Sequence, residues 1–151
     1  MSQTEAKQIK GYILRIREDF LLNTAFVEVL THNNFIEVKL PTKVENYKYK
    51  PFLNFGNLIL FDLVKTRKHW IVTHLDYLHK LHFQDWAYIK FETLSELNKI
   101  LLKNLHIDQG CKVLDTLKLY LERLDDLTLK EDPKNFLIEF ESKILSDLGF
   151  N

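Results

Sequence analysis

The 151-residue chain is poor in the residues on which several protein classes depend. Its single cysteine, Cys111, excludes a disulfide framework, a four-cysteine zinc site and a paired-cysteine redox motif. Four glycines and three prolines exclude collagen-like and low-complexity chains. No apolar run approaches the ~18 residues of a membrane-spanning helix, and the polar start at Met1–Lys10 is unlike a signal peptide. These absences predict a soluble, cytoplasmic protein without membrane contact.

Net charge is also missing, because 21 Lys and Arg balance 21 Asp and Glu. This neutrality argues against a strongly basic nucleic-acid-binding protein, although it permits a local basic face. Residues 1–90 carry 13 basic against 9 acidic side chains, whereas residues 91–151 carry 8 against 12. Either the asymmetry is chance or the chain has a basic front and an acidic rear with different partners.

Hydrophobic residues are plentiful, at 46%, and up to about Tyr77 they fall in short runs typical of strands. The runs expected to form strands are Ile9–Ile16, Thr24–Leu30, Phe35–Leu40, Leu58–Val64 and Trp70–Leu75. His32-Asn33-Asn34 is expected to form a turn, and Pro41–Pro51 a loop. No helical pattern separates these runs, which predicts an antiparallel sheet or a small barrel.

Beyond about His82 the apolar spacing becomes helical. A first helix is expected to include Leu94–Leu105, with Thr93 to Glu96 as a capping box, although Trp86 and Ile89 leave open a start near Asp85. A second helix is expected over Val113–Leu124.

The third helix has the clearest ends. Asp132 can serve as its N-cap, with Pro133 in the first position, and Gly149 as the left-handed residue after it, with Phe150 packing back. Strands followed by helices predict an α+β fold of two modules, residues 1–80 and 81–151.

Motifs of catalysis and metal binding are scarce. His69, His74, His79 and His82 form a cluster, but their spacing places them on no single face. The sequence has no HExxH motif, no Gly-x-Ser-x-Gly motif and no phosphate-binding glycine loop. The pairs Asp125-Asp126 and Glu131-Asp132 are interpreted as solvated turn charges and a helix cap. We therefore expect no enzymatic activity, no metal, no cofactor and no small-molecule substrate.

A binding surface is the remaining candidate. Single-stranded nucleic acid requires cations for its phosphates and flat rings on which its bases can stack. The candidate phosphate contacts are Arg15, Arg17, Lys39, Lys43, Lys48, Lys50, Arg67 and Lys68, and the candidate stacking side chains are Tyr47, Tyr49 and Trp70. The alternative is that these aromatic rings belong partly to the core and the lysines only decorate a loop.

Four segments carry motifs that occur together in one family: Lys10–Arg15, Thr24–Thr31, Phe55–Leu63, and Phe136–Phe150 with Phe-Glu followed by Leu-Gly-Phe. Together they resemble the family of the recombination mediator protein RecO. The first three resemble its opening, second and fourth strands, and the last, which has the spacing of the family's helix, is the closest match. The resemblance implies an N-terminal five-stranded OB-fold barrel for DNA binding, followed by an α-helical module.

The resemblance also implies partners and activities. RecO proteins bind single- and double-stranded DNA, anneal complementary strands, and help load RecA onto DNA coated by single-stranded-DNA-binding protein, together with RecR. The chain is then expected in the cytoplasm, at the nucleoid. It departs from the family in the weakly basic Lys39–Lys50 and in the absence of a zinc-binding cysteine cluster, so it is expected to be a short or divergent member, or to lack a rear portion. The alternative is an OB-fold protein-interaction adaptor that does not bind DNA.

Overall fold

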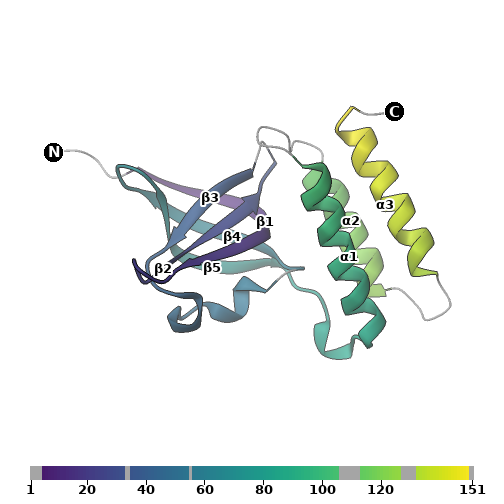
Figure 1. Ribbon diagram of the computed structural model, residues 1–151, viewed down its shortest axis with the longest axis horizontal. Helices are drawn as coiled ribbons and strands as arrows, with labels where there is room; N and C mark the ends of the chain where they lie inside the picture. Colours follow the sequence, from purple (N-terminus) through teal and green to yellow (C-terminus); the bar gives the residue numbers. More distant parts are fainter. Residues whose placement is uncertain (1–4, 33–34, 55, 106–112, 127–131, 150–151) are drawn as a thin grey trace. The chain divides into compact units, whose positions relative to one another are not determined.

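The computed structural model describes residues 5–32, 35–54, 56–105, 113–126 and 132–149. Its contacts divide the chain into a β-unit, with strands between Ala6 and Lys80, and a helical unit from Leu81 onwards. The fold is α+β, with five strands followed by three helices (Figure 1). Asn33 and Asn34 of the expected turn, together with Cys111, Glu131 and Phe150, lie outside the described residues.

The strands occur where the apolar runs predict them. They are β1 (Ala6–Asp19), β2 (Thr24–Leu30), β3 (Phe35–Leu40), β4 (Leu58–Lys65) and β5 (Trp70–His79). β2 and β3 have the predicted bounds, whereas β1 and β5 extend further. These extensions are strands because their neighbours pair with them: β4 pairs with the start of β1 and the end of β5, and β2 pairs with the end of β1. Backbone pairing does not require apolar side chains.

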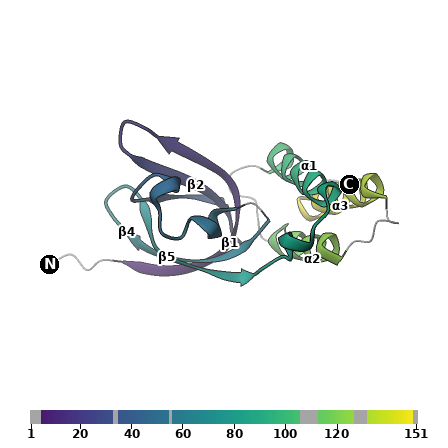
Figure 2. The same ribbon diagram turned by 90° about the horizontal axis from the view of Figure 1, so that it is seen from below.

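The strands pair in the order β1-β2-β3-β5-β4, and β4 pairs back with β1, so the sheet closes on itself (Figure 2). Four of the ladders are antiparallel, as expected. The fifth, between β3 and β5, is parallel, which the expectation of an antiparallel sheet missed. β1, which is 14 residues long, pairs with β4 through its first half and with β2 through its second half, with a shift of register between Ile13 and Arg15.

Alternate side chains of the strands fill the centre of the β-unit. Ile13, Val27, Val38 and Phe61 belong to this core and are fully buried. Gly11 permits the close approach of β1 to β2, because a Cβ there would lie 2.2 Å from Cγ1 of Val29. No other residue fits at this position without displacing the neighbouring strand.

The segment between β3 and β4, expected to be a loop, contains two short 3₁₀ helices, η1 (Val44–Asn46) and η2 (Lys50–Leu53). Tyr47 and Leu53 from this segment are buried in the core of the β-unit. The segment therefore closes part of the core rather than lying free in solvent.

The helical unit contains α1 (Tyr88–Asn104), α2 (Val113–Asp126) and α3 (Pro133–Asp147), preceded by a 3₁₀ turn, η3 (Phe83–Asp85). α3 contacts both α1 and α2 (Figure 1). The apolar positions predicted for α2 are buried, and Phe136, Phe140 and Ile144 provide the buried stripe of α3.

The predicted ends of α3 are confirmed, whereas the capping box predicted for α1 is not. The Asp132 carboxylate accepts a hydrogen bond of 2.9 Å from the Lys134 backbone N–H, which makes it the N-cap of α3. Gly149 has the expected positive φ, of 89°. The capping box at Thr93 is wrong, because α1 begins five residues earlier and the Thr93 hydroxyl donates to the Ile89 carbonyl.

Candidate nucleic-acid interface

The turn between β4 and β5 presents two of the predicted cations to solvent. Thr66 and His69 close the turn, with the Thr66 N–H donating to the His69 carbonyl at 2.9 Å. Arg67 and Lys68 lie between them and are exposed. Neither forms an ion pair with any residue that the structure describes. Thr66–His69, here called the β4–β5 tip, therefore offers two positive charges to an anionic ligand.

Trp70 follows this tip and is covered by two lysines. Its ring packs partly against the core, and the Nζ atoms of Lys7 and Lys65 lie 4.0 and 5.5 Å from the ring centroid. Cation–π contacts of this kind contribute about 0.5–1 kcal/mol at exposed sites. Sequence reasoning named Trp70 but missed Lys7, which strand pairing brings from the start of the chain, opposite Leu63.

Arg15 and Arg17 point to one side of β1, as predicted, but both are paired. Arg15 Nε lies 2.9 Å from the Glu28 carboxylate, and Arg17 Nη2 lies 3.4 Å from the Glu37 carboxylate. Glu28 and Glu37 face each other across β2 and β3, so two arginines neutralise two adjacent carboxylates. The four residues together carry no formal net charge, which weakens this surface as a phosphate site.

A second cross-strand row, which mixes cations with an aromatic ring, lies two residues along each strand from the row of Arg15, Glu28 and Glu37. Arg17 opposes Phe26 on β2, and Phe26 opposes Lys39 on β3. The guanidinium carbon of Arg17 lies 4.8 Å from the Phe26 ring centroid. The rings of His69 and Phe26 pack edge to face, with their centroids 5.4 Å apart. The sequence analysis named Arg17 and Lys39, but Phe26 was missed because it sits inside an apolar run.

The three lysines between Lys43 and Lys50 have different surroundings. Lys43 lies 4.8 Å from the ring centroid of Phe20, in the turn between β1 and β2. Lys48 lies 4.9 Å from the Tyr49 ring, and Lys50 is exposed. The Tyr49 hydroxyl is 2.8 Å from Nδ1 of His74, which places Tyr49, and its neighbours Lys48 and Lys50, beside the middle of β5.

Tyr47 offers no face on which a base could stack. Its side chain is 8% exposed and belongs to the core. Burial, reinforced by the neighbouring Tyr49, raises the pKa of Tyr47 to about 12. The alternative considered for the aromatic rings, that they serve the core, describes Tyr47 and in part Tyr49 and Trp70.

Strand pairing brings only some of the candidate DNA-binding residues to one end of the sheet. The turn from β1 to β2 lies at this end, where Asp19 opposes Thr24, and so does the turn from β4 to β5, where Lys65 opposes Trp70. β3 ends there too, since Lys39 opposes Ile71. This hairpin end of the sheet carries Lys43, Arg67, Lys68 and Trp70, with Arg17 and Lys39 close by, whereas Arg15, Lys48 and Lys50 lie further along.

Three of the four histidines singled out in the sequence have different side-chain partners. His69 contacts Phe26, His74 contacts Tyr49, and His82 contacts Asp125. Within the described ranges, no three His, Cys, Asp or Glu side chains are grouped so that they could hold a metal ion.

Asp125 was interpreted as a solvated turn charge, and this is wrong. It lies in the last turn of α2 with its side chain 6% exposed. Its carboxylate accepts hydrogen bonds from the His82 N–H at 3.0 Å, from His82 Nδ1 at 2.7 Å and from Trp86 Nε1 at 2.7 Å. Burial acts to raise the pKa of Asp125, but these bonds outweigh it and lower the pKa below its usual value.

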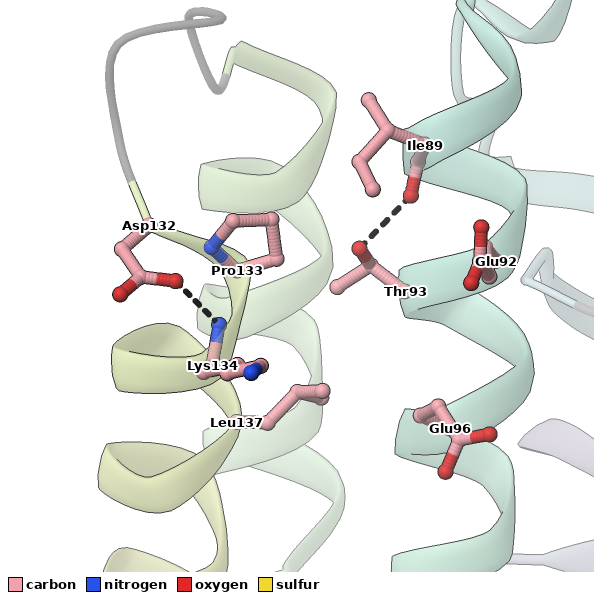
Figure 3. A pocket seen from close by; sticks show the side chains of 8 residues that line it. All are labelled: Ile89, Glu92, Thr93, Glu96, Asp132, Pro133, Lys134 and Leu137. Atoms are coloured by element: carbon pink, nitrogen blue, oxygen red, sulfur yellow. Dashed lines mark hydrogen bonds between the residues drawn. The ribbon is translucent and has the colours of Figure 1, made fainter.

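α1 and α3 enclose a hollow of about 330 Å³ (Figure 3). Ile89, Thr93, Pro133 and Leu137 lie between the two helices in this view, with acidic side chains around them. The carboxylates come from Glu92, Glu96 and Asp132, against one cation, Lys134. An apolar floor with an acidic rim repels phosphate and suits a basic group on an apolar stem.

No protein-family model matches the chain, and no curated protein matches it. None of the helices in the described ranges is long and apolar enough to cross a membrane.

The segment Phe136–Phe150, singled out in the sequence, lies mostly in α3. Phe140 is fully buried and its ring centroid is 5.2 Å from that of Tyr120 on α2. The Glu141 carboxylate accepts a hydrogen bond of 3.3 Å from the side-chain amide of Asn104 on α1. In this chain the Phe-Glu pair thus joins α3 to both other helices, and Gly149 ends the motif with positive φ.

Proposed function

We propose that the chain is a RecO-like mediator of DNA repair and recombination whose β-unit binds single-stranded DNA without sequence specificity. The observation that carries the proposal is the position of two exposed cations, Arg67 and Lys68, which form no ion pair with a described residue, at the hairpin end of a closed five-stranded sheet. OB-folds bind oligonucleotides through the β2–β3 face and the loops between β1 and β2 and between β4 and β5.

The strand order supports an OB-fold barrel for the β-unit. The order β1-β2-β3-β5-β4, with a parallel β3–β5 ladder and β1 shared between β2 and β4, is the arrangement of that fold. The segment with Tyr47 and Leu53 occupies the position between the third and fourth strands and fills one part of the core.

The chemistry suits sequence-independent binding. The cations near the hairpin end can neutralise phosphates, and the partly exposed rings of Trp70 and Tyr49 can contact bases without reading them. Annealing requires a surface that lowers phosphate repulsion and leaves base edges free to pair. The proposed activity is therefore binding and strand annealing rather than catalysis, and no cofactor is required.

The partners in this proposal are single-stranded DNA, double-stranded DNA as a second ligand, RecR, and the single-stranded-DNA-binding protein from which RecA loading begins. The same proposal places the protein in the cytoplasm, at the nucleoid. These follow from the resemblance in the strands and in α3.

The test is fluorescence anisotropy of a labelled single-stranded oligonucleotide at several salt concentrations. If about five phosphates are contacted, log K falls against log salt with a slope near −3.5. Arg67→Glu with Lys68→Glu should weaken binding for all sequences alike and reduce the slope by about 1.4. The matched control is Lys118→Glu with Lys134→Glu, which changes the net charge equally on exposed positions of the helical unit. Equal effects of the two variants would contradict the proposed site.

A second candidate, a protein-interaction adaptor, is favoured by the hollow between α1 and α3 (Figure 3). Its acidic rim suits a partner segment in which Lys or Arg alternates with apolar residues. Binding of a labelled peptide of that composition should be lost in Glu92→Lys and kept in Asp126→Lys, an equal charge change on an exposed position of α2. Binding of an acidic peptide of equal length instead would exclude this site.

A further inference from the structure

The turn between β1 and β2 carries three consecutive large apolar side chains in water. Phe20, Leu21 and Leu22 are 72%, 98% and 63% exposed, and none belongs to the core of the β-unit. Tight hairpin turns favour Asn, Asp and Gly, and an exposed apolar run is unfavourable unless a partner covers it. The packing of the β-unit therefore does not explain these residues. Phe20–Asn23 is called the β1–β2 tip below.

The β1–β2 tip is held in an ordered turn. One carboxylate oxygen of Asp19 accepts hydrogen bonds from the backbone N–H groups of Leu21 and Leu22, at 3.0 and 3.2 Å. Asn23 takes the left-handed conformation, with φ of 54°, and strand pairing resumes at Thr24 opposite Asp19. The turn thus keeps its apolar side chains pointing outward, and the Asp19 charge is engaged by the backbone.

Cations lie on the same end of the sheet as the β1–β2 tip. Lys43 lies 4.8 Å from the Phe20 ring centroid, and Arg67 and Lys68 extend from the β4–β5 tip. The contact between Phe26 and His69 shows that the start of β2 and the β4–β5 tip are neighbours. A nucleic-acid strand held by these cations would therefore pass beside the apolar tip.

We propose that the β1–β2 tip is an apolar wedge that packs against the last base pair at a junction between single- and double-stranded DNA. The inference rests on the proposed DNA binding and names the DNA structure that the site prefers. Two of the three side chains are leucines, which lack a ring for stacking on single bases. Aliphatic and Phe side chains are the ones that proteins insert against base steps, where they partly unstack the duplex.

The charges favour DNA over a lipid surface as the occupant. Glu18 and Asp19 directly precede the tip on β1, and cations lie on Lys43 and on the β4–β5 tip. An anionic bilayer would surround the tip with phosphates and meet both carboxylates. A DNA strand approaches from one side and can contact the cations alone. A wedge at the junction would also act where two strands are being annealed.

The test compares binding to three labelled DNAs of equal strand length: a single strand, a blunt duplex, and a duplex with a single-stranded tail. The tailed duplex carries 2-aminopurine at the junction, whose fluorescence rises when the base unstacks. We expect the wild-type protein to bind the tailed duplex at least fivefold more tightly than either other DNA, with a rise in 2-aminopurine fluorescence.

Leu21→Ser with Leu22→Ser should abolish the junction preference and the fluorescence rise, while affinity for the single strand changes less than twofold. Both side chains are largely in solvent, so the thermal midpoint should stay unchanged. Leu119→Ser with Ile138→Ser is the matched control, because these residues are 61% and 67% exposed in the helical unit. This control should keep the junction preference.

Three results would overturn the wedge. Single-strand binding that is sensitive to Arg67→Glu, but with no junction preference, would reject the wedge and leave the proposed DNA binding intact. Leu21-dependent binding to vesicles containing an anionic phospholipid, without junction preference, would assign the tip to lipid. Absence of binding to all three DNAs would reject the wedge together with the proposed function.

Discussion

The indole N–H of Trp86 donates a 2.7 Å hydrogen bond to the carboxylate of Asp125, 39 residues further along the chain. The backbone N–H and ring Nδ1 of His82 bond to the same carboxylate, and Lys90 Nζ donates to the Asp125 backbone carbonyl. Asp125 therefore ties two segments to the end of α2: its carboxylate holds the segment before α1, and its backbone carbonyl holds the start of α1.

Asp125→Ala should destabilise the helical unit by about 2–4 kcal/mol, because several donors lose a largely buried acceptor. The free energy of unfolding can be measured with urea, followed by circular dichroism at 222 nm. Asp126→Ala, at an exposed position next to it, should change the unfolding free energy by less than about 0.5 kcal/mol. Similar losses in both variants would show that the hydrogen bonds to Asp125 do not stabilise the unit.

The same carboxylate predicts a pH dependence. The pKa of Asp125 is lower in the folded chain than its usual value of about 3.9, so the folded state binds this proton less readily than the unfolded state. Its contribution to stability is complete above the unfolded pKa and is lost as the pH falls through the folded pKa. In Asp125→Asn, the unfolding free energy should decline less between pH 5 and pH 2 than in the wild type. An unchanged decline would contradict the lowered pKa.

Tyr47 predicts a second, alkaline transition. Its pKa of about 12 exceeds the ordinary tyrosine value of about 10, because the buried hydroxyl resists ionisation. The folded state therefore retains this proton more strongly, and the resulting stability is present below about pH 10 and lost as the pH rises towards 12. Absorbance at 295 nm should show tyrosines that ionise late, because burial also raises the pKa of Tyr120, and Tyr47→Phe should remove part of this late change. Ionisation of all tyrosines near pH 10 would contradict the buried position.

Release of the paired arginines should strengthen DNA binding. Glu28→Gln with Glu37→Gln removes the two carboxylates beside Arg15 and Arg17, which frees both guanidinium groups for phosphates. We expect an affinity gain of roughly tenfold at low salt and a salt slope steeper by about 1.4. Glu122→Gln with Glu141→Gln, in the helical unit, provides an equal charge change as the control. A gain of the same size in this control would indicate that bulk charge alone sets the affinity.

Gly11 should tolerate substitution less well than Gly149. An added Cβ would lie 2.2 Å from Val29 Cγ1 and 2.9 Å from the Leu30 carbonyl oxygen, so Gly11→Ala should cost about 3 kcal/mol or more. Gly149 has positive φ, but nothing lies close to the position that a Cβ would take. Gly149→Ala should therefore lower the free energy of unfolding by about 1–2 kcal/mol. Thermal unfolding of both variants tests the order. A milder effect at Gly11 would mean that β1 and β2 can separate locally.

Much of the fold could be predicted because the signals are local. β2 and β3 have the predicted bounds, since β-branched and aromatic residues recur there between turn residues. Asp132 and Pro133 predicted the start of α3, because an N-cap followed by proline is a signal that two adjacent residues carry by themselves. The start of α1 was left open between Asp85 and Thr93, because Thr93 resembles a cap locally, but it is buried inside a helix that begins at Tyr88.

The candidate site could be predicted only in part. Arg67 and Lys68 stand exposed in a four-residue turn, where the local sequence is enough to place them. Lys7 and Trp70 are 63 positions apart, and only the closure of the sheet brings them into contact. Phe26 has no feature in the local sequence that distinguishes it from other strand residues. Only the strand pairing places it between Arg17 and Lys39.

The amino-acid sequence by itself determined the type and order of the elements, because helical and strand periodicities arise from residues a few positions apart. Only the tertiary structure decided which charges are available. Arg15 and Arg17 are matched by Glu28 and Glu37, which lie 13 and 20 positions away, through the register of the paired strands. The environment of a side chain depends on which distant segments fold against it, and local spacing does not contain that information.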